Sequence, residues 1–344
     1  MDNYNFSVDA VKYWDIGQGS YLTDGKAGMS SGKSVTERLF SFFARANYSY
    51  QDKYMLSASI RHEGSSKFAA DNRWANFWSA TAGWRISNEE FMKDFDWLDD
   101  LKIRFGYGVT GNNDFSATYM ANMLGSDTNW MMPNGTWAYS YGKSQNVNPN
   151  LGWEEKKEWN LGVDYSFFEG RLYGKFDYYR REVDNLLFSV KVPQPPYTQG
   201  SQMQNIGSME SKGWEFEVGG DIIRTKDFTW SSSMNLSHNT GKILTLEGDN
   251  SYHNGNGFVA PGTPGDAARM EAGSTIGSFY MWKFAGFDDE GSFLLYNKDG
   301  EVIPAAQKTE NDKQYIGNYT PKLIIGWSHT LTYKNFDLGI NLRS

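Results

Sequence analysis

The feature that most constrains the fold of this chain is an alternation of apolar and polar residues that returns segment after segment. In one such segment, Phe40, Phe42 and Tyr48 alternate with Ser41 and Arg45. Because successive side chains of a strand point to opposite faces, this period of two predicts strands with one apolar and one polar face. The alternating segments are 39–50, 53–61, 78–87, 101–109, 158–167, 172–181, 214–222, 228–236, 323–331 and 336–342. Strands of about ten residues are long enough to cross a bilayer when tilted, whereas strands of soluble proteins have about five or six residues.

The connections between these segments alternate between short and long. Short connections lie at 51–52, 168–170, 224–226 and 334–335, with a moderate one at 88–99. Long connections lie at 63–73, 110–154, 184–212 and 239–319. Bacterial outer-membrane barrels have short periplasmic turns and long outer loops, and compact soluble domains rarely tolerate several long loops. We therefore predict an all-β fold, a segment of an antiparallel transmembrane β-barrel with about ten strands.

The composition excludes several other classes of protein. The 344 residues include no cysteine, which excludes disulfide scaffolds, thiolate metal sites and cysteine nucleophiles. A net charge of −8 argues against nucleic-acid binding, because phosphate neutralisation needs a basic surface. No apolar run approaches the ~18 residues of a transmembrane helix. The 13 Trp, 21 Tyr and 22 Phe argue against disorder.

The alternation also assigns individual residues to the two faces of the predicted sheet. The residues predicted to point outward to lipid are Phe40, Trp84, Leu101, Val163, Phe216 and Ile340. Those predicted on the opposite face are Arg45, Arg104, Asp164 and Glu217. Rings that flank two short connections are predicted to form a periplasmic aromatic girdle, and these are Tyr48, Tyr50, Tyr54, Phe167 and Phe168.

Several stretches resemble a known family, and they do so in the same order along the chain. Those nearer the N-terminus are ARANYSYQDKYMLSASIRHEGSSKF, SATAGWRISNEEFMKD and LKIRFGYGVTGNND. Later ones are NPNLGWEEKKEWNLGVDYSFFEGRLYGKFDYYRREVDNLL, NIGSMESKGWEFEVGGDII, STIGSFYMWKFAGF and YTPKLIIGWSHTLTYKNFDLGI. They resemble the barrel of SusC/RagA-type TonB-dependent outer-membrane transporters. The resemblance covers nearly everything from Glu37 onward.

This resemblance implies a complete protein with a barrel of about 22 strands and an N-terminal plug, in the outer membrane of a Gram-negative, Bacteroidota-type cell. It implies import of an oligosaccharide or peptide with a SusD-like surface lipoprotein, driven by energy relayed through the TonB complex. The opening MDNYNFSVDA has neither the basic nor the apolar region of a signal peptide. We expect a barrel fragment that lacks signal peptide, plug and closing strands, with a loop at 1–36 and the partial TonB-dependent-receptor-type barrel at 37–344.

One long connection is rich in aromatic rings. Segment 129–141 carries no charge, and its rings are Trp130, Trp137, Tyr139 and Tyr141. Exposed rings stack on sugar faces or grip a partner protein, so these four residues are the candidate ligand contacts. The alternative is a loop that folds around its own rings.

No motif predicts catalysis, a cofactor or a metal site. Segment 28–34 departs from a phosphate-binding loop in its glycine spacing. Segment 297–301, together with 288–291 before it, is better explained by a pair of hairpin turns than by a calcium loop. The histidines have no metal-ligand spacing, and they are His62, His238, His253 and His329.

The chain is accordingly predicted not to be an enzyme, although an outer-membrane protease would show the same alternation of turns. Two further alternatives stay open. One is a soluble β-rich binding or adhesin module, and the other is a truncated, nonfunctional barrel fragment.

Overall fold

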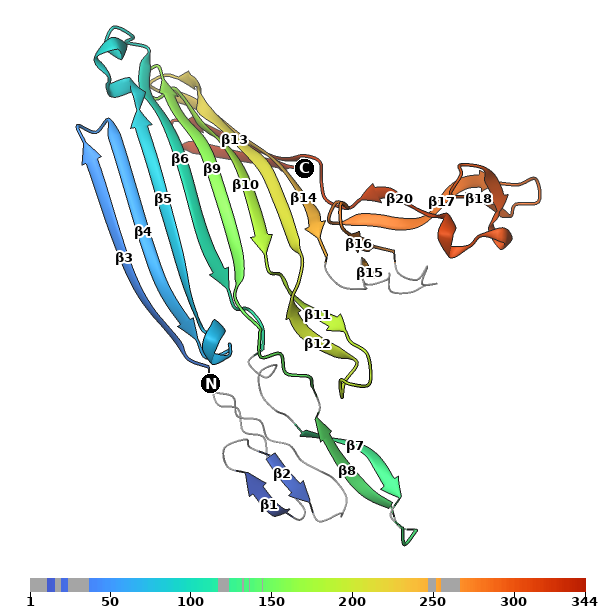
Figure 1. The fold of residues 1–344 in the computed structure, drawn as a ribbon. Helices are drawn as coiled ribbons and strands as arrows, with labels where there is room; N and C mark the ends of the chain where they lie inside the picture. Colours follow the sequence, from blue (N-terminus) through green and yellow to red (C-terminus); the bar gives the residue numbers. More distant parts are fainter. Residues whose placement is uncertain are drawn as a thin grey trace.

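The fold centres on one ten-stranded antiparallel sheet (Figure 1). The computed structural model describes residues 11–15, 20–23, 37–116, 124–131, 133–135, 137–143, 145–246, 252–254 and 267–344. In spatial order the strands are β3 (Leu39–Tyr50), β4 (Tyr54–Ser65), β5 (Trp74–Arg85), β6 (Leu98–Asn112), β9 (Glu154–Phe167), β10 (Leu172–Asp184), β13 (Ser208–Arg224), β14 (Phe228–Thr245), β21 (Ile324–Tyr333) and β22 (Phe336–Arg343). Spatial order follows chain order, as in an up-and-down meander, and β3 and β22 are the edges. The predicted antiparallel strands are confirmed, in an open sheet.

The hydrogen-bonded register joins the alternating positions into two continuous surfaces. One row of direct partners runs from β3 to β21 through Tyr50, Tyr54, Trp84, Ile103, Val163, Phe176, Phe216, Leu236 and Ile325. Direct partners on antiparallel strands share a face, and we call this one the ring face and the opposite one the polar face. The six residues predicted to face lipid all lie on the ring face, and the four predicted opposite them lie on the polar face. The predicted register is confirmed.

The short links lie together at one end of the sheet, the upper end in Figure 1. The link between β5 and β6 is the longest of them and contains two 3-10 turns, η2 (Ile86–Asn88) and η3 (Glu90–Met92). The β3–β4 link is tight because Gln51 and Asp52 both have positive φ, 51° and 50°, and the Lys53 amide donates to the Tyr50 carbonyl at 2.9 Å. Two central residues with positive φ suit the twist of a hairpin.

The long links lie at the other end, and three of the four form hairpins of their own (Figure 1). These are β7 (Leu124–Met131) with β8 (Trp137–Lys143), β11 (Leu187–Lys191) with β12 (Ser201–Asn205), and β15 (Tyr252–Asn254) with β16 (Arg269–Glu271). A four-stranded sheet contains β17 (Ser278–Phe287), β18 (Phe293–Tyr296), β19 (Val302–Pro304) and β20 (Lys313–Asn318), with the 3-10 turns η5 (Ala305–Gln307) and η6 (Glu310–Asp312) before β20. Within 1–36, β1 (Val11–Asp15) pairs with β2 (Ser20–Thr23). The expected boundary at residue 37 stays a prediction.

Strands β13 and β14 extend well beyond their alternating segments, to 17 and 18 residues. The predicted ends were therefore wrong at the long-link side. There the ring face is charged as well: Arg180 pairs with Glu210 at 2.6 Å and Lys157 with Asp184 at 2.7 Å. Where both faces are polar the alternation disappears, but the backbone ladder continues.

A small apolar core lies at the long-link end, where η1 (Ala70–Asn72) belongs to the β4–β5 link. Its buried members are Phe68, Phe77, Phe115, Leu151 and Trp153. The rings of its four aromatic members contact one another at centroid distances of 4.9 to 5.3 Å. In the part of the chain that the structure describes, no helix is long and apolar enough to span a membrane.

Candidate functional site

The polar face carries a three-residue ion cluster at its centre. The guanidinium of Arg104 on β6 donates to both carboxylate oxygens of Asp164 on β9, at 2.7 and 2.8 Å. It also donates to both oxygens of Asp177 on β10, each at 3.2 Å. The contact with Asp164 joins two guanidinium nitrogens to two carboxylate oxygens, which fixes the side chain in direction as well as in position, whereas both contacts with Asp177 come from Nη2 alone. The cluster therefore links three strands across the polar face.

A glycine creates the space for this cluster. Gly162 is the direct cross-strand partner of both Arg104 and Asp177. A Cβ at this position would lie 2.6 Å from Asp177 Oδ1 and 2.7 Å from Arg104 Cζ. Only a residue without a side chain lets both charged groups meet over the backbone of β9.

Further ion pairs extend this charged surface on either side. Lys175 pairs with Glu217 at 3.1 Å, and Arg181 pairs with Glu158 at 2.8 Å. Each pair joins directly opposed residues on neighbouring strands. A wall of this kind is hydrated and carries both signs of charge, so it can line an aqueous path without retaining one sign of ion.

Beside the cluster the polar face is hollowed. A hollow of about 550 Å³ is lined by small residues that include Ser57, Thr81 and Gly83, by Lys102 and Arg104, and by apolar residues such as Met55 and Phe105. Its hydroxyl groups and the Lys102 ammonium give it the capacity to hold hydrogen-bonding molecules beside apolar surface.

The apolar core closes over the polar face farther along, because Phe77 of β5 points to that face. A Cβ at Gly111 would collide with the Phe77 ring. The Trp153 indole donates to the Arg73 carbonyl at 3.1 Å, and the Asn205 side chain makes two hydrogen bonds with the backbone of Gly152, at 2.7 and 2.9 Å. These contacts fix the segment before β9 to the end of the β4–β5 link and to the β11–β12 hairpin.

Aromatic rings border the apolar band of the ring face on both sides. Near the short links Trp97 contacts Phe167 at 5.6 Å and Trp327 contacts His329 at 4.6 Å. Near the long links the contacts are Trp78–Tyr107 at 5.1 Å, Trp159–Tyr178 at 5.4 Å and Trp214–His238 at 6.2 Å. Amphipathic rings in two belts are typical of a surface that crosses both interfaces of a bilayer.

Comparison with known proteins gives one family. The family model described as TonB dependent receptor-like, beta-barrel, matches residues 2–343. The chain belongs to this family.

Two curated relatives are similar over most of the chain. The TonB-dependent receptor SusC of Bacteroides thetaiotaomicron is 34% identical and covers 93% of the chain, which corresponds to 32% of that protein. The TonB-dependent receptor P3 of Formosa agariphila is 33% identical over 98% of the chain and 34% of its own length. The chain thus spans about a third of these relatives.

A solved structure agrees in fold. The structure of the RagAB peptide transporter superposes with a TM-score of 0.77 at 28% identity, over 93% of this chain and 35% of that one. The TonB-dependent receptor barrel is an outer-membrane fold, and this places the chain in the outer membrane rather than among soluble binding modules. The family is one of receptors and transporters, not of enzymes.

In this TonB-dependent receptor barrel the four predicted ligand contacts fall on one hairpin. Trp130 lies in β7, and Trp137, Tyr139 and Tyr141 lie in β8. In the backbone register Trp130 pairs with Ala138 and Trp137 pairs with Met131. Their side chains lie outside the described residues, so their role in ligand contact stays a prediction.

The other sequence motifs have structural roles where they are described. In the β18–β19 turn, Asn297 Oδ1 accepts from the Asp299 and Glu301 amides at 3.0 and 2.8 Å, and Gly300 has φ of 84°. The hairpin interpretation is confirmed. No group of three or more His, Cys, Asp or Glu suited to a metal ion occurs in the described ranges. Segment 28–34 lies outside the described residues.

A carboxylate at the short-link end has a strongly perturbed pKa. Glu89, between β5 and β6, accepts from the Tyr54 hydroxyl at 2.7 Å, the Trp84 indole at 3.0 Å and the Lys53 ammonium at 3.1 Å. The hydrogen bond from Tyr54, followed by those from Trp84 and Lys53, lowers the pKa of Glu89 to about 2. The network joins the link to Tyr54, one of the predicted girdle rings, and to Trp84.

A surface that the sequence pattern did not reveal lies on the β17–β18 hairpin. Phe284, Phe287 and Phe293 are 51%, 59% and 58% exposed, and their centroids lie 5.1 to 5.9 Å apart. We call these three residues the phenylalanine patch. A bulge between Phe284 and Gly286 brings Phe284 and Phe287 onto one face with Phe293. The signal that could have found it is the repeated phenylalanine around an Asp-Asp-Glu-Gly turn.

Proposed function

We propose that this chain forms part of the wall of a TonB-dependent active transporter that imports an oligosaccharide or a peptide. The observation that carries the proposal is the two-faced sheet, with a ring face for lipid and a polar face crossed by ion pairs, in a member of this family. The RagAB relative is a peptide transporter, which supports a peptide as one of the two substrate classes. The proposed protein moves its substrate without catalysing a reaction.

The test is uptake by cells. The protein is expected to fractionate with the outer membrane and to migrate anomalously before heating, as closed barrels do. Cells without it are expected to lose growth on one oligosaccharide or peptide substrate and to regain it on complementation. Recovery as a soluble monomer without detergent, or unchanged growth on every oligosaccharide and peptide tried, would contradict the proposal.

We also propose that the protein works with a SusD-like surface lipoprotein, and that the phenylalanine patch contacts it. Exposed apolar patches on a water-facing module mark interaction sites, and clustered aromatic rings commonly carry binding energy. The β17–β18 hairpin projects away from the ten-stranded sheet (Figure 1), so the sheet does not cover the patch. The adjoining turn carries Asp288, Asp289 and Glu290, which favours a partner with basic residues around an apolar pocket.

The rings of β7 and β8 are the proposed substrate contacts. Trp137→Ala is expected to weaken substrate binding about tenfold, since stacking of one ring contributes on the order of that factor. The control is Met131→Ala, the direct backbone partner of Trp137. If Trp137→Ala and Met131→Ala weaken substrate binding equally, the rings serve the folding of the hairpin and not substrate contact.

A further inference from the structure

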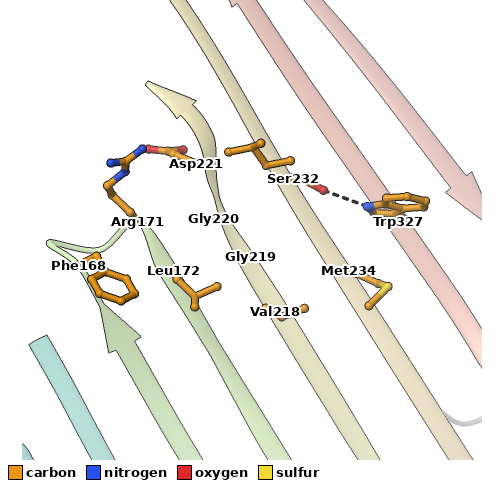
Figure 2. A pocket seen from close by; sticks show the side chains of 11 residues that line it. Phe168, Arg171, Leu172, Val218, Gly219, Gly220, Asp221, Ser232, Met234 and Trp327 are labelled. Carbon is orange, nitrogen blue, oxygen red and sulfur yellow. Dashed lines mark hydrogen bonds between the residues drawn. The ribbon is translucent and has the colours of Figure 1, made fainter. Parts of the chain in front are cut away.

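The ring face has an apolar hollow near the short links that the transport function does not use. Its volume is about 490 Å³, and it lies across β10, β13, β14 and β21 (Figure 2). It is lined mainly by Phe168, Leu172, Val218, Met234 and Trp327, with Arg171 at its rim. Volumes of this size are typical of small-molecule sites.

The hollow exists because two neighbouring positions carry small residues. Gly220 and Ser232 are direct partners, in a row that runs from Leu172 to His329. A Cβ at Gly220 would collide with the Arg171 carbonyl. The next row contains the larger Val218, Met234 and Trp327, so the small pair leaves a depression beside a bulky wall.

The hollow is apolar because its polar atoms are occupied. The Trp327 indole donates to Ser232 Oγ at 2.9 Å, as Figure 2 shows. Apolar depressions with satisfied polar groups exclude water and accept hydrocarbon. Since this face contacts lipid, an acyl chain is the hydrocarbon at hand.

A cation lies where the headgroup of such a lipid would be. Arg171, in the short link between β9 and β10, is exposed, and its guanidinium makes no ion pair or hydrogen bond with another described residue. Figure 2 shows it beside Asp221, whose carboxylate accepts from Ser231 Oγ at 2.6 Å and pairs with Arg224 at 3.6 Å. An arginine at the edge of an apolar band suits a phosphate group.

We propose that this hollow binds one phospholipid, with an acyl chain over Gly220 and Ser232 and the phosphate at Arg171. The inference rests on the outer-membrane placement and not on the identity of the imported substrate. Binding requires both parts of the phospholipid, because the hollow holds the acyl chain and Arg171 holds the phosphate.

Native mass spectrometry of the protein purified from outer membranes in detergent tests this. Phosphatidylglycerol is titrated into the protein, and diacylglycerol and glycerol 3-phosphate are titrated in parallel as the chain alone and the phosphate alone. One bound phosphatidylglycerol is expected, with at least about tenfold weaker retention of either part. If diacylglycerol is retained as well as phosphatidylglycerol, the hollow binds acyl chains and has no headgroup site. If glycerol 3-phosphate is retained as well as phosphatidylglycerol, there is a phosphate site and no acyl-chain site.

Variants locate the lipid. Ser232→Leu fills the hollow and is expected to abolish retention, and Arg171→Gln is expected to weaken it about tenfold. The matched control is Lys226→Gln, a cation in the next short link that does not line the hollow, and retention is expected to be unchanged. Heat-modifiable migration checks that each variant folds, and Val218→Phe replaces Ser232→Leu if the latter does not.

Equal retention in Arg171→Gln and Lys226→Gln, or undiminished retention in a folded filling variant, would overturn the inference. Substrate uptake is measured on the same variants. A variant that loses the lipid but takes up substrate normally leaves the transport proposal intact. If the unmodified protein is not recovered in the outer membrane, the transport proposal itself is contradicted.

Discussion

At the scale of single residues, Gly162 leaves the space that the central ion cluster needs. Gly162→Ala would push Arg104 and Asp177 apart, because the new Cβ would lie 2.7 Å from Arg104 Cζ and 2.6 Å from Asp177 Oδ1. We expect a loss of about 1–2 kcal/mol in the free energy of unfolding, typical of a disturbed polar cluster at a partly exposed site. The measurement is the urea midpoint of the heat-modifiable form.

The control for this substitution is Gly339→Ala. Gly339 also lies on the polar face of a strand, but a Cβ there would meet nothing within 4 Å. Equal midpoints for the two variants would show that the space above Gly162 is not limiting.

The sequence predicted the face of Arg104 and Asp164 but not their pairing with Asp177. The face of a side chain depends only on its position within its own strand. The partner depends on the register between strands far apart in sequence, such as Arg104 and Asp177, 73 positions apart. Local patterns do not encode that register, and so the cluster became visible only in the structure.

Glu89 provides a pH-dependent contribution to stability. Its pKa is lowered from 4.5 to about 2 in the folded chain. The hydrogen bonds to its carboxylate therefore stabilise the fold fully above pH about 4.5, and this contribution is lost as the pH falls from there toward 2. We expect the difference in urea midpoint between the unmodified protein and Glu89→Gln to shrink over this range.

Glu169→Gln, in another short link, is the control for Glu89→Gln, and its midpoint is expected to follow that of the unmodified protein. Tyr54→Phe should reproduce part of the Glu89→Gln effect, since Tyr54 donates the shortest of the three hydrogen bonds. A constant difference from pH 5 down to pH 2 would exclude Glu89 as the titrating group.

At the scale of elements, the phenylalanine patch and the opposite face of the same small sheet give a matched experiment. We expect Phe287→Ser combined with Phe293→Ser to weaken co-purification of the partner lipoprotein at least about tenfold. Val302→Ser is the control, because Val302 is 53% exposed but its partner Tyr296 alternates with Phe293 and lies on the other face. Quantitative pull-down from detergent-solubilised outer membranes is the measurement.

If the double phenylalanine variant and Val302→Ser lose co-purification of the lipoprotein equally, the cause is unfolding of the hairpin and not a lost contact. The hairpin itself was predicted from its turn residues, but the patch was not. Phe284 and Phe287 share a face only because a bulge changes the alternation between them, and a bulge is not visible in a period of two.

The full length of β13 and β14 is a second feature that the sequence alternation did not predict. Within the bilayer the two faces meet different solvents, so sequence alternation marks the strand. Beyond the outer ring belt both faces meet water, and pairs such as Arg180–Glu210 occupy the ring face. The strand continues because its backbone hydrogen bonds do not depend on the difference between the faces.

At the scale of the whole molecule, the sheet should behave as one boundary between lipid and water. The chain has no cysteine, so single cysteines can report the environment of each face. Ser57→Cys and Ser233→Cys lie on the polar face, and their chain neighbours Ala58→Cys and Met234→Cys lie on the ring face. We expect a membrane-impermeant maleimide to label the first pair in the folded protein and to leave the second pair unlabelled until the protein is denatured.

The same reagent tests the orientation of the sheet. Short links of outer-membrane barrels face the periplasm, so Glu169→Cys should be labelled only after the outer membrane is permeabilised, whereas Ser292→Cys in the β17–β18 turn should be labelled in intact cells. The control is the unmodified protein, which has no thiol to react. Labelling of Glu169→Cys in intact cells would reverse the orientation, and labelling of Ala58→Cys and Ser57→Cys alike would mean that no lipid covers the ring face.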